Sequence, residues 1–376
     1  MIYMLIFFIV SISYTFFGYP LLLKILSKKY KDNIRPSFKY TQPITVLLVV
    51  CNEEINISNK INNIFNFEYS KEKIKLIIVD DASDDNTVSI IESYNDSRIT
   101  IIKNNMRSGK AYGINEGMKK VDTDLVMLVD ARQVINTTAM KDLASWFCPG
   151  NKVGAVSGEV KFRGHESGFE SGMDAYQRYE KYIRKNESSI SGVPGVSGAI
   201  YMLRKKLFEP IENDTVLDDV LIPMNVAKQG YWVGYDDRAI AWDIPSHDMA
   251  REKQRKTRTL KGNYQLLFRH LDWCVPGMHP LWFQYLSHKV SRLTAPFFAL
   301  AVLFISIVMY FQGLEVFGML SLCLLIGFSL YPLSILFPKI NNFTILKIGS
   351  SFVALNWFNL LGFFQYFFGS DKQSWK

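Results

Sequence analysis

The sequence predicts an α/β protein in which a mostly parallel, Rossmann-like sheet is flanked by helices and lies between transmembrane helices at the two ends of the chain. Two observations predict this arrangement. Residues 1–26 and 293–368 are strongly hydrophobic, whereas residues 27–292 are of mixed polarity. Within the mixed part, short β-branched runs alternate with helical patterns, which is typical of parallel sheets covered on both faces.

The first predicted element is a membrane anchor over residues 1–26. Residues 2–26 carry one charged side chain, Lys24, and exceed the roughly 20 residues that a helix needs to cross a bilayer. The segment lacks the basic start and small-residue cleavage site of a secretory signal, so we interpret it as a retained anchor. Basic residues follow it, namely Lys24, Lys28, Lys29, Lys31 and Arg35. They place the following domain in the cytoplasm.

The central domain is expected over residues 43–275 and begins with short apolar strands. The predicted strands are residues 44–50, 74–79, 99–103 and 125–129. Loops with acidic residues follow the first, second and fourth of them. Because carboxyl ends of parallel strands share one edge, where such sheets bind ligands, we expect these loops to form one site. Asp84 and Asp85 precede a helical pattern, and for these two we favour a helix-capping role.

The C-terminal part is expected to contain an interfacial helix and about three membrane segments. Residues 276–292 mix aromatic and basic side chains, as interfacial helices do. The segments that follow are residues 293–311, 316–337 and 343–368, with Lys339 in a break that suits a cytoplasmic turn. Core helices of a soluble protein are the alternative, but uncharged runs of this length are rare there.

The composition limits the classes of ligand. A net charge of +8 in a membrane protein favours anionic lipids and phosphate-bearing substrates. No basic array with interleaved aromatic residues suggests nucleic-acid binding. The four cysteines have neither metal-binding nor redox spacing, and the histidines lack metal-ligand spacing.

Four candidate site residues stand out from their types and places alone. Asp80, Asp81 and Asp130 are carboxylates at one sheet edge, which suits a nucleotide and a divalent cation on its diphosphate. Lys110 follows Gly109 at a helix start and suits a phosphate, although a solvated basic loop would look the same.

Seven stretches in one order carry a family resemblance. They are CNEE at 51–54, VDDASDD at 79–85, RSGKAYGIN at 107–115, LVDAR at 128–132, GVSGAIYMLRK at 195–205, LDDVLIP at 217–223 and RKTRTLKGN at 255–263. Together they resemble the inverting family 2 glycosyltransferases of GT-A fold, specifically membrane-embedded bacterial members similar to polysaccharide synthases. The resemblance covers roughly residues 43–292.

The resemblance implies the donor side of the site. Glu53 and Asp81 are expected to contact the nucleotide, with Asp80 beside them. Asp130 opens the motif that holds the diphosphate and a divalent cation, Mg2+ or Mn2+. That motif usually ends in a second carboxylate, but this chain has Arg132 there. We expect Arg132 to pair with phosphate and to replace part of the metal's charge.

The resemblance also implies the acceptor side. Asp219 is expected to be the catalytic base and Asp218 to bind the acceptor, although both residues suit a helix cap as well. Ser197 and Gly198 are expected to approach the acceptor, and a tight turn before a strand is the alternative reading.

A basic stretch before the membrane region completes the expected site. Arg255 and Arg258 are expected to bind the diphosphate. The family motif ends in Trp where this chain has Thr259, which weakens the case for a long-chain polymerase. A membrane-surface helix is the alternative reading of this stretch.

The expected function is transfer of a sugar from a UDP-sugar to a membrane-associated saccharide or lipid-linked acceptor in surface polysaccharide synthesis. The expected location is the bacterial inner membrane, with other synthesis and export proteins as partners and single sugar addition as a close second. The alternative from another class of function is a catalytically silent protein that binds nucleotide or lipid and supports a separate synthase. Arg132, in place of the usual second carboxylate, motivates this alternative.

Overall fold

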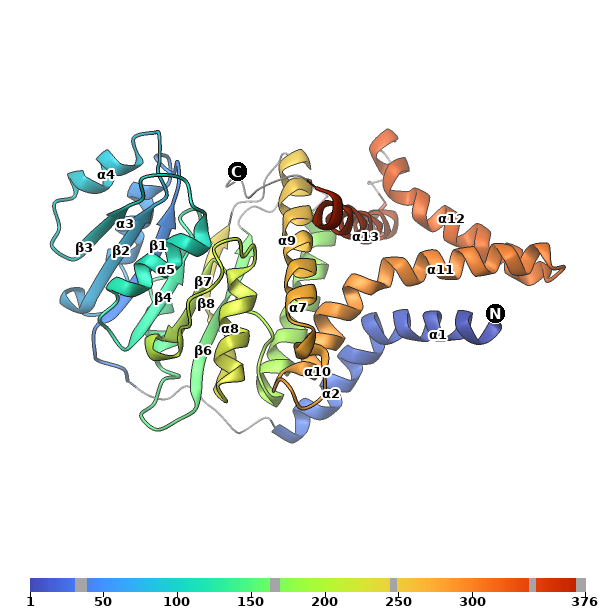
Figure 1. Ribbon diagram of the computed structural model, residues 1–376, viewed down its shortest axis with the longest axis horizontal. Coiled ribbons are helices and arrows are strands. Elements are labelled where there is room, and N and C mark those ends of the chain that lie inside the picture. Colours follow the sequence, from blue (N-terminus) through green and yellow to red (C-terminus); the bar gives the residue numbers. More distant parts are fainter. Residues whose placement is uncertain (31–38, 163–169, 244–248, 338–342, 370–376) are drawn as a thin grey trace.

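The computed structural model describes residues 1–30, 39–162, 170–243, 249–337 and 343–369. Lys31, Arg35 and Lys339 of the sequence-based topology lie outside these residues. Figure 1 shows two parts: a sheet with its covering helices on one side, and α1, α11 and α12 extending from it on the other. The helices α7 and α9 stand between the two parts (Figure 1).

The central element is an eight-stranded mixed sheet in the order β3-β2-β1-β4-β7-β6-β8-β5. Its strands are β1 Ile44–Val50, β2 Ile74–Asp80, β3 Ile99–Lys103, β4 Leu125–Val129, β5 Val134–Ile135, β6 Val153–Phe162, β7 Ile200–Arg204 and β8 Trp232–Asp243. The predicted mostly parallel α/β fold is confirmed: β1 to β4 are parallel, as are β6 and β8, while β7 and β5 run antiparallel to their neighbours. The carboxyl ends of β1, β2, β4, β6 and β8 therefore share one edge with the start of β7.

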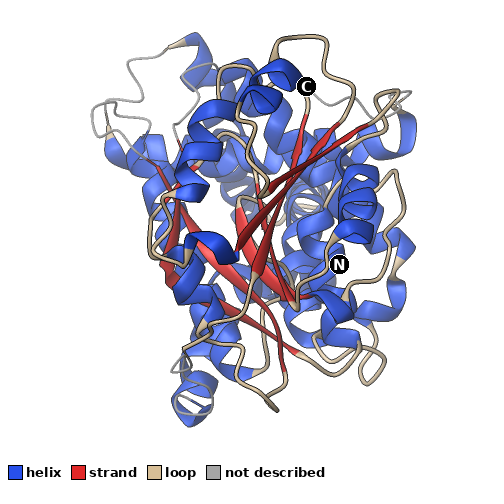
Figure 2. Cartoon of the chain, turned by 90° about the vertical axis from the view of Figure 1, so that its left-hand side faces the viewer, coloured by secondary structure: helices blue, strands red, loops and turns tan. Residues whose placement is uncertain are grey.

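Helices cover both faces of the sheet, and Figure 2 shows the strands enclosed between them. Every residue of β1 is buried, because alternate side chains face opposite layers. One layer contains α3 Ile57–Phe65, α4 Thr87–Ser93 and α6 Ala139–Ala144. The other contains α5 Lys110–Lys120 and α8 Asp218–Lys228.

Two glycines allow α5 to lie directly on β1. A Cβ atom on Gly113 would lie 2.5 Å from Val49 Cγ1, and one on Gly117 would lie 2.3 Å from Leu47 Cδ1. No larger side chain fits between helix and sheet without movement. This close packing fixes the first residue of α5, Lys110, above the carboxyl edge of the strands.

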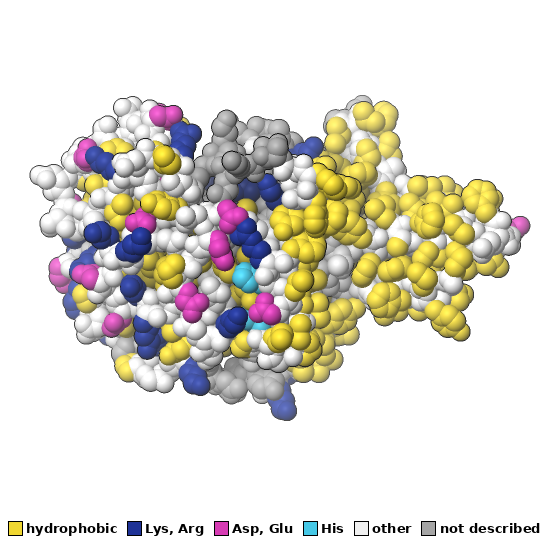
Figure 3. Space-filling model, viewed as in Figure 1, with side chains coloured by type: hydrophobic (Ala, Val, Ile, Leu, Met, Phe, Trp, Pro, Cys, Tyr) yellow, Lys and Arg dark blue, Asp and Glu magenta, His cyan; other side chains and the backbone are white. Residues whose placement is uncertain are grey.

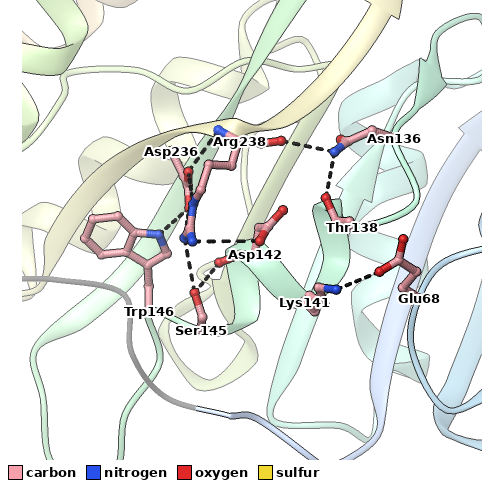
Figure 4. Close-up of polar contacts among 9 residues, drawn as sticks. All are labelled: Glu68, Asn136, Thr138, Lys141, Asp142, Ser145, Trp146, Asp236 and Arg238. Atoms are coloured by element: carbon pink, nitrogen blue, oxygen red, sulfur yellow. Dashed lines mark hydrogen bonds and ion pairs between the residues drawn. The ribbon is translucent and has the colours of Figure 1, made fainter.

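A polar network attaches α6 to β8, as Figure 4 shows. Asp236 accepts hydrogen bonds from Trp146 Nε1 at 2.7 Å and Arg238 Nε at 3.0 Å. Arg238 also lies 3.8 Å from Asp142, and the ring of Trp146 stacks on that of Trp232 with centroids 5.3 Å apart. Asp236 is buried, so its paired charge holds this end of the sheet in place.

The remaining helices include short helical turns within the sheet domain and the long helices of the apolar part. They are α1 Ile2–Ser13, η1 Tyr14–Gly18, α2 Tyr19–Tyr30, η2 Lys71–Lys73, α7 Glu170–Ile190, η3 Lys205–Leu207, α9 Met249–Arg269, η4 Leu271–Cys274, α10 Trp282–Gln284, η5 Tyr285–Val290, α11 Ser291–Phe311, α12 Glu315–Leu336 and α13 Thr344–Phe368. Among the described residues, four helical stretches are long and apolar enough to cross a membrane: Ile2–Lys29, Trp282–Phe311, Glu315–Leu336 and Ile345–Phe368. Hydrophobic side chains cover the surface of that part (Figure 3).

The segment expected to be an interfacial helix, residues 276–292, is partly continuous with the next helix, and its place at a membrane interface stays a prediction. From Trp282 it is continuous with α11, as a stretch of 30 residues. Leu281 and Tyr285 are buried against the second layer of the sheet domain, so this end of the helix is seated on protein. At 1.5 Å per residue the stretch is about 45 Å long, roughly 15 Å more than the hydrocarbon core of a bilayer.

Candidate active site

Asp81 organises the loop that leads into α5. Its carboxylate accepts hydrogen bonds from Asn104 Nδ2 at 2.9 Å, Ser108 N at 2.8 Å and Gly109 N at 2.9 Å. Gly109 has φ +92°, a left-handed conformation that favours glycine, and the helix begins at the next residue. Asp81 has no exposed surface. In this structure it positions Lys110, and its direct contact with a nucleotide stays a prediction.

Asp80 and Glu53 lie at the ends of β2 and β1 and retain acceptor capacity. Asp80 is buried, and one of its oxygens accepts from Ser83 N at 3.1 Å. Its other oxygen has no hydrogen-bond partner among the described residues. Burial raises the pKa of the Glu53 carboxyl, which accepts from Asn56 Nδ2 at 2.7 Å. Ala82, directly after Asp80 and Asp81, has φ +55°, a strained conformation that often occurs at functional sites.

Lys110 is the centre of a group that we name the carboxylate–lysine cluster: Lys110, Asp130, Asp218 and Asp219. Its Nζ lies 3.0 Å from Asp130 Oδ1 and 3.3 Å from Asp218 Oδ2. Burial alone would lower the pKa of Lys110, but the charges of Asp130, Asp218 and Asp219 outweigh burial and raise it. The cluster thus joins residues from α5, the end of β4 and the start of α8.

Asp219 lies beside the loop of residues 195–198. Its carbonyl oxygen accepts from Val196 N at 2.8 Å, and a Cβ atom on Gly198 would lie 3.4 Å from its Oδ2. Gly198 is partly exposed and faces Asp219, whereas Ser197 is buried and donates its N–H to Ser157 at 2.9 Å. Of the two predicted acceptor residues, Gly198 is the one beside the cluster's carboxylate.

The pKa of Asp219 suits proton transfer. Burial and the neighbouring charge of Asp218 raise its pKa to about 6, although Lys110 and Lys289 act in the opposite direction. The carboxylate is therefore mostly ionised at neutral pH, with a basicity closer to the operating pH than an exposed aspartate has.

Arg132 and Arg255 meet at a residue that the sequence did not indicate, Asp243. Asp243 ends β8, is 2% exposed, and accepts from Arg132 Nη2 at 2.7 Å and Gln133 Nε2 at 3.2 Å. Arg255 Nη1 lies 3.7 Å from the same oxygen. Arg258 is exposed on α9 and has no hydrogen bond or ion pair with the cluster in the described part of the chain. The structure therefore brings Arg255, rather than Arg258, to Arg132, and diphosphate binding by Arg258 stays a prediction.

Two further buried residues near the carboxylates were missed. Lys60 is 1% exposed and donates to the carbonyl oxygen of Gln133; burial lowers its pKa to about 8, against the charges of Asp130 and Glu53. The hydroxyl of Tyr201, on β7, is buried without a hydrogen-bond partner among the described residues. A sequence signal existed for Lys60, because it interrupts the apolar stripe of α3.

The donor set limits how a metal ion would be held. In the described ranges, no three His, Cys, Asp or Glu side chains are grouped as a metal site. The side chain of Asp130 is 39% exposed and stands beside Lys110. Mg2+ is often bound through one or two carboxylates together with substrate phosphates and water. The residues fit a divalent cation shared between Asp130 and a bound diphosphate.

The sheet topology and the acidic residues at its carboxyl edge define the class: a transferase domain of GT-A fold joined to apolar helices. Residues 45–211 match the family model described as Glycosyl transferase family 2. Residues 45–211 therefore form a family 2 glycosyltransferase domain, as the motifs predicted.

Known relatives and one solved structure extend this result. The poly-β-1,6-N-acetyl-D-glucosamine synthase of Staphylococcus epidermidis strain RP62A is 24% identical over 71% of this chain and 65% of its own length. The enzyme of the same name from Staphylococcus aureus strain COL is 25% identical over 64% of this chain and 60% of its own length. The chain thus spans somewhat less than two thirds of these relatives.

The mannosyltransferase PcManGT from Pyrobaculum calidifontis, solved with GDP-Man and Mn2+, has a TM-score of 0.71 and 18% identity. The match covers 98% of this chain and 100% of that one, so the shared fold includes the apolar helices.

Proposed function

We propose that the chain is an inverting glycosyltransferase that moves a sugar from a UDP-sugar to a membrane-associated saccharide or lipid-linked acceptor in surface polysaccharide synthesis. One observation carries the proposal. A carboxylate with a raised pKa, Asp219, stands beside the partly exposed Gly198 and within a cluster in which Lys110 joins Asp130 and Asp218. The staphylococcal relatives, named as polysaccharide synthases, support the acceptor class.

The proposed reaction is a single displacement. The carboxylate of Asp219 accepts the proton of an acceptor hydroxyl while that oxygen forms a bond to the anomeric carbon of the donor sugar. The bond from this carbon to the diphosphate oxygen breaks on the opposite face, and UDP leaves with the electron pair. The configuration at the anomeric carbon is therefore inverted, and no covalent enzyme intermediate is needed.

The other residues of the site bind and balance charge. Lys110 offsets the negative charges of Asp130 and Asp218 next to the departing diphosphate. Arg132 is 44% exposed and Arg255 42% exposed, so both retain surface to approach phosphate oxygens while they pair with Asp243. A divalent cation bound at Asp130 would neutralise further diphosphate charge; the Mn2+ of the Pyrobaculum complex supports this assignment.

The proposed location is the bacterial inner membrane, with the sheet domain in the cytoplasm, where nucleotide sugars are made available. The basic residues Lys24, Lys28 and Lys29 at the end of the first span support this orientation. Membrane lipids surround the apolar helices in this arrangement, and further polysaccharide synthesis and export proteins are proposed partners.

The test is a donor screen with the full chain in lipid nanodiscs. UDP release is measured for a panel of UDP-sugars in the presence of membrane extracts as acceptor, and the product is analysed by mass and by anomeric configuration. Release from at least one donor, with an inverted product and loss of turnover in Asp219→Asn, supports the proposal. Retained UDP binding without turnover for every donor would instead favour the catalytically silent partner of another synthase.

A further inference from the structure

The helix that enters the apolar part begins at the candidate active site and contributes a lysine to it. Lys289 lies in η5, in the first ten residues of the stretch Trp282–Phe311. Because this stretch is roughly 15 Å longer than a bilayer core, its first turns project beyond the hydrocarbon. Their polar side chains include Ser287, His288, Lys289 and Arg292.

The ammonium of Lys289 and the backbone of Asp219 meet at Gly195. A Cβ atom on Gly195 would lie 3.7 Å from Lys289 Nζ and 3.7 Å from the carbonyl oxygen of Asp219. Gly195 is buried in the loop that donates Val196 N to that same carbonyl. The lysine of the helix and the backbone of the proposed base therefore both lie close to one glycine.

The other acidic groups around Lys289 already have partners. Glu180 of α7 is paired with Arg292 and lies 3.3 Å from His288 Nε2. Glu187 of α7 accepts from Tyr19 at 2.6 Å and lies 3.0 Å from His288 Nδ1. Among the described residues, no carboxylate forms an ion pair with Lys289.

These pairs also fix the position of the helix start. Tyr19 belongs to the first span, α7 to the sheet domain, and His288 to the helix of Lys289, so Glu187 joins all three. The hydroxyl of Tyr14, also from the first span, lies 2.8 Å from Ser287 Oγ. Buried and fully paired groups of this kind are held in one geometry, because separating them exposes unpaired charge.

We propose that Lys289 is a positioning residue for the sugar transfer: its ammonium stabilises the ionised form of Asp219. The proposal rests on the proposed function and adds the membrane helix to the catalytic machinery. Lys110 forms ion pairs with Asp130 and Asp218, and Lys289 is a second cation whose charge acts on Asp219. The other charged groups that face this pair are Arg184 and Glu180 on α7 and Arg292 on α11.

The lowering of the Asp219 pKa by both Lys110 and Lys289 agrees with this geometry. Without the Lys289 charge, burial and the charge of Asp218 should raise the pKa of Asp219 further. The acid limb of the pH profile, where kcat/KM falls as Asp219 becomes protonated, should then move to higher pH by about half to one unit. A shift of this size is expected when two charges, here those of Lys289 and Asp219, lie close together in a partly buried site.

The experiment compares wild type, Lys289→Gln, Lys289→Arg and a charge-removal control, Lys185→Gln, in nanodiscs with the donor identified above. Lys185 lies on α7, and its side chain is 65% exposed. We expect kcat/KM of Lys289→Gln to fall about two- to fivefold at pH 6 and to approach the wild-type value at pH 9. Lys289→Arg should restore the wild-type limb, Lys185→Gln should not move it, and UDP affinity should be unchanged in all four proteins.

An unmoved acid limb in folded Lys289→Gln would overturn the inference while leaving the proposed function intact. An equal loss at every pH would also overturn it, because that result indicates a structural role only. If Lys289→Gln does not fold, the test depends on Lys289→Arg. Because a guanidinium keeps the positive charge, the acid limb of Lys289→Arg should match that of the wild type, and a shifted limb would contradict the proposal. A wild type that releases UDP from no donor would overturn both the function and the inference.

Discussion

Replacing Lys110 by methionine should destabilise the folded protein at neutral pH and far less in acid. The substitution keeps the length of the side chain and removes a cation that is in ion-pair contact with both Asp130 and Asp218. Three carboxylates of the cluster are then left near one another without that charge. At neutral pH they repel, whereas protonation in acid relieves the repulsion.

The magnitude follows from the burial of each partner. Asp218 is 8% exposed and 3.3 Å from Lys110 Nζ, and breaking such a buried pair costs roughly 3–5 kcal/mol. Asp130 is 39% exposed, so water and salt reduce its share to about 1 kcal/mol or less. Part of the Asp218 cost is relieved by movement of its neighbours, and we expect a net loss of about 3 kcal/mol.

The pH dependence has a definite sign. The pKa of Lys110 is raised in the folded protein, so its stabilisation is fully present below its unfolded pKa and is lost only as pH rises through the folded value. In the methionine variant the deficit should therefore extend across neutral and mildly alkaline pH. It should shrink below pH of about 6, where Asp219 takes up its proton.

The assay is thermal unfolding in nanodiscs between pH 5 and pH 9. A loss of about 3 kcal/mol corresponds to roughly 6–12 °C for a domain of this size. Lys119→Met is the matched control on the same helix, because its side chain is 66% exposed and its melting temperature should not change. A Lys110→Met protein as stable as wild type at pH 7.5 would show that the cluster does not depend on this cation.

Further predictions concern the site and the helix that positions it. Asp219→Asn should retain UDP affinity and lower turnover by about 10²–10⁴-fold, whereas Asp81→Ala should weaken UDP binding; equal losses of binding in titration calorimetry would contradict the two roles. Wild-type turnover should fall as pH decreases through about 6, because Asp219 must be ionised to accept a proton; a profile that is flat to pH 5 would argue against it as base. If Arg132 replaces a metal ligand, part of the turnover should survive chelator, and complete loss in a UDP-release assay would reject that substitution. Gly113→Ala should destabilise the protein by about 1–2 kcal/mol, because overpacking against the stiff Val49 outweighs the gain in helix propensity, and an unchanged melting temperature would refute the packing argument.

The first strands were predictable because their signal is local. Residues 44–50, 99–103 and 125–129 are short, mostly apolar runs bounded by polar loops, and the structure has strands with these bounds. Strand β2 is one residue longer and includes Asp80. The acidic residues that follow these runs reach one edge because parallel strands place them there.

The partners within the site were not predictable in the same way. Arg132 meets Asp243 from a strand 111 positions later, a contact that depends on the order β6-β8-β5 of the sheet. The sequence indicated an interfacial position for Lys289 because its neighbours are aromatic. Its closeness to Asp219 depends on how the helix that carries it packs against Gly195. Arg258 matched a motif position, yet its exposure follows from the orientation of α9, which no local pattern encodes.

The two outer strands of the sheet bear on self-association. β5 has only two residues, and β3 has five and ends in Lys103, whose ammonium lies 2.5 Å from Glu92. Short outer strands and terminal lysines discourage the addition of a strand from another molecule, which is a common start of aggregation. A protein confined to a surface reaches high local concentrations, and these two strands favour copies that remain separate there.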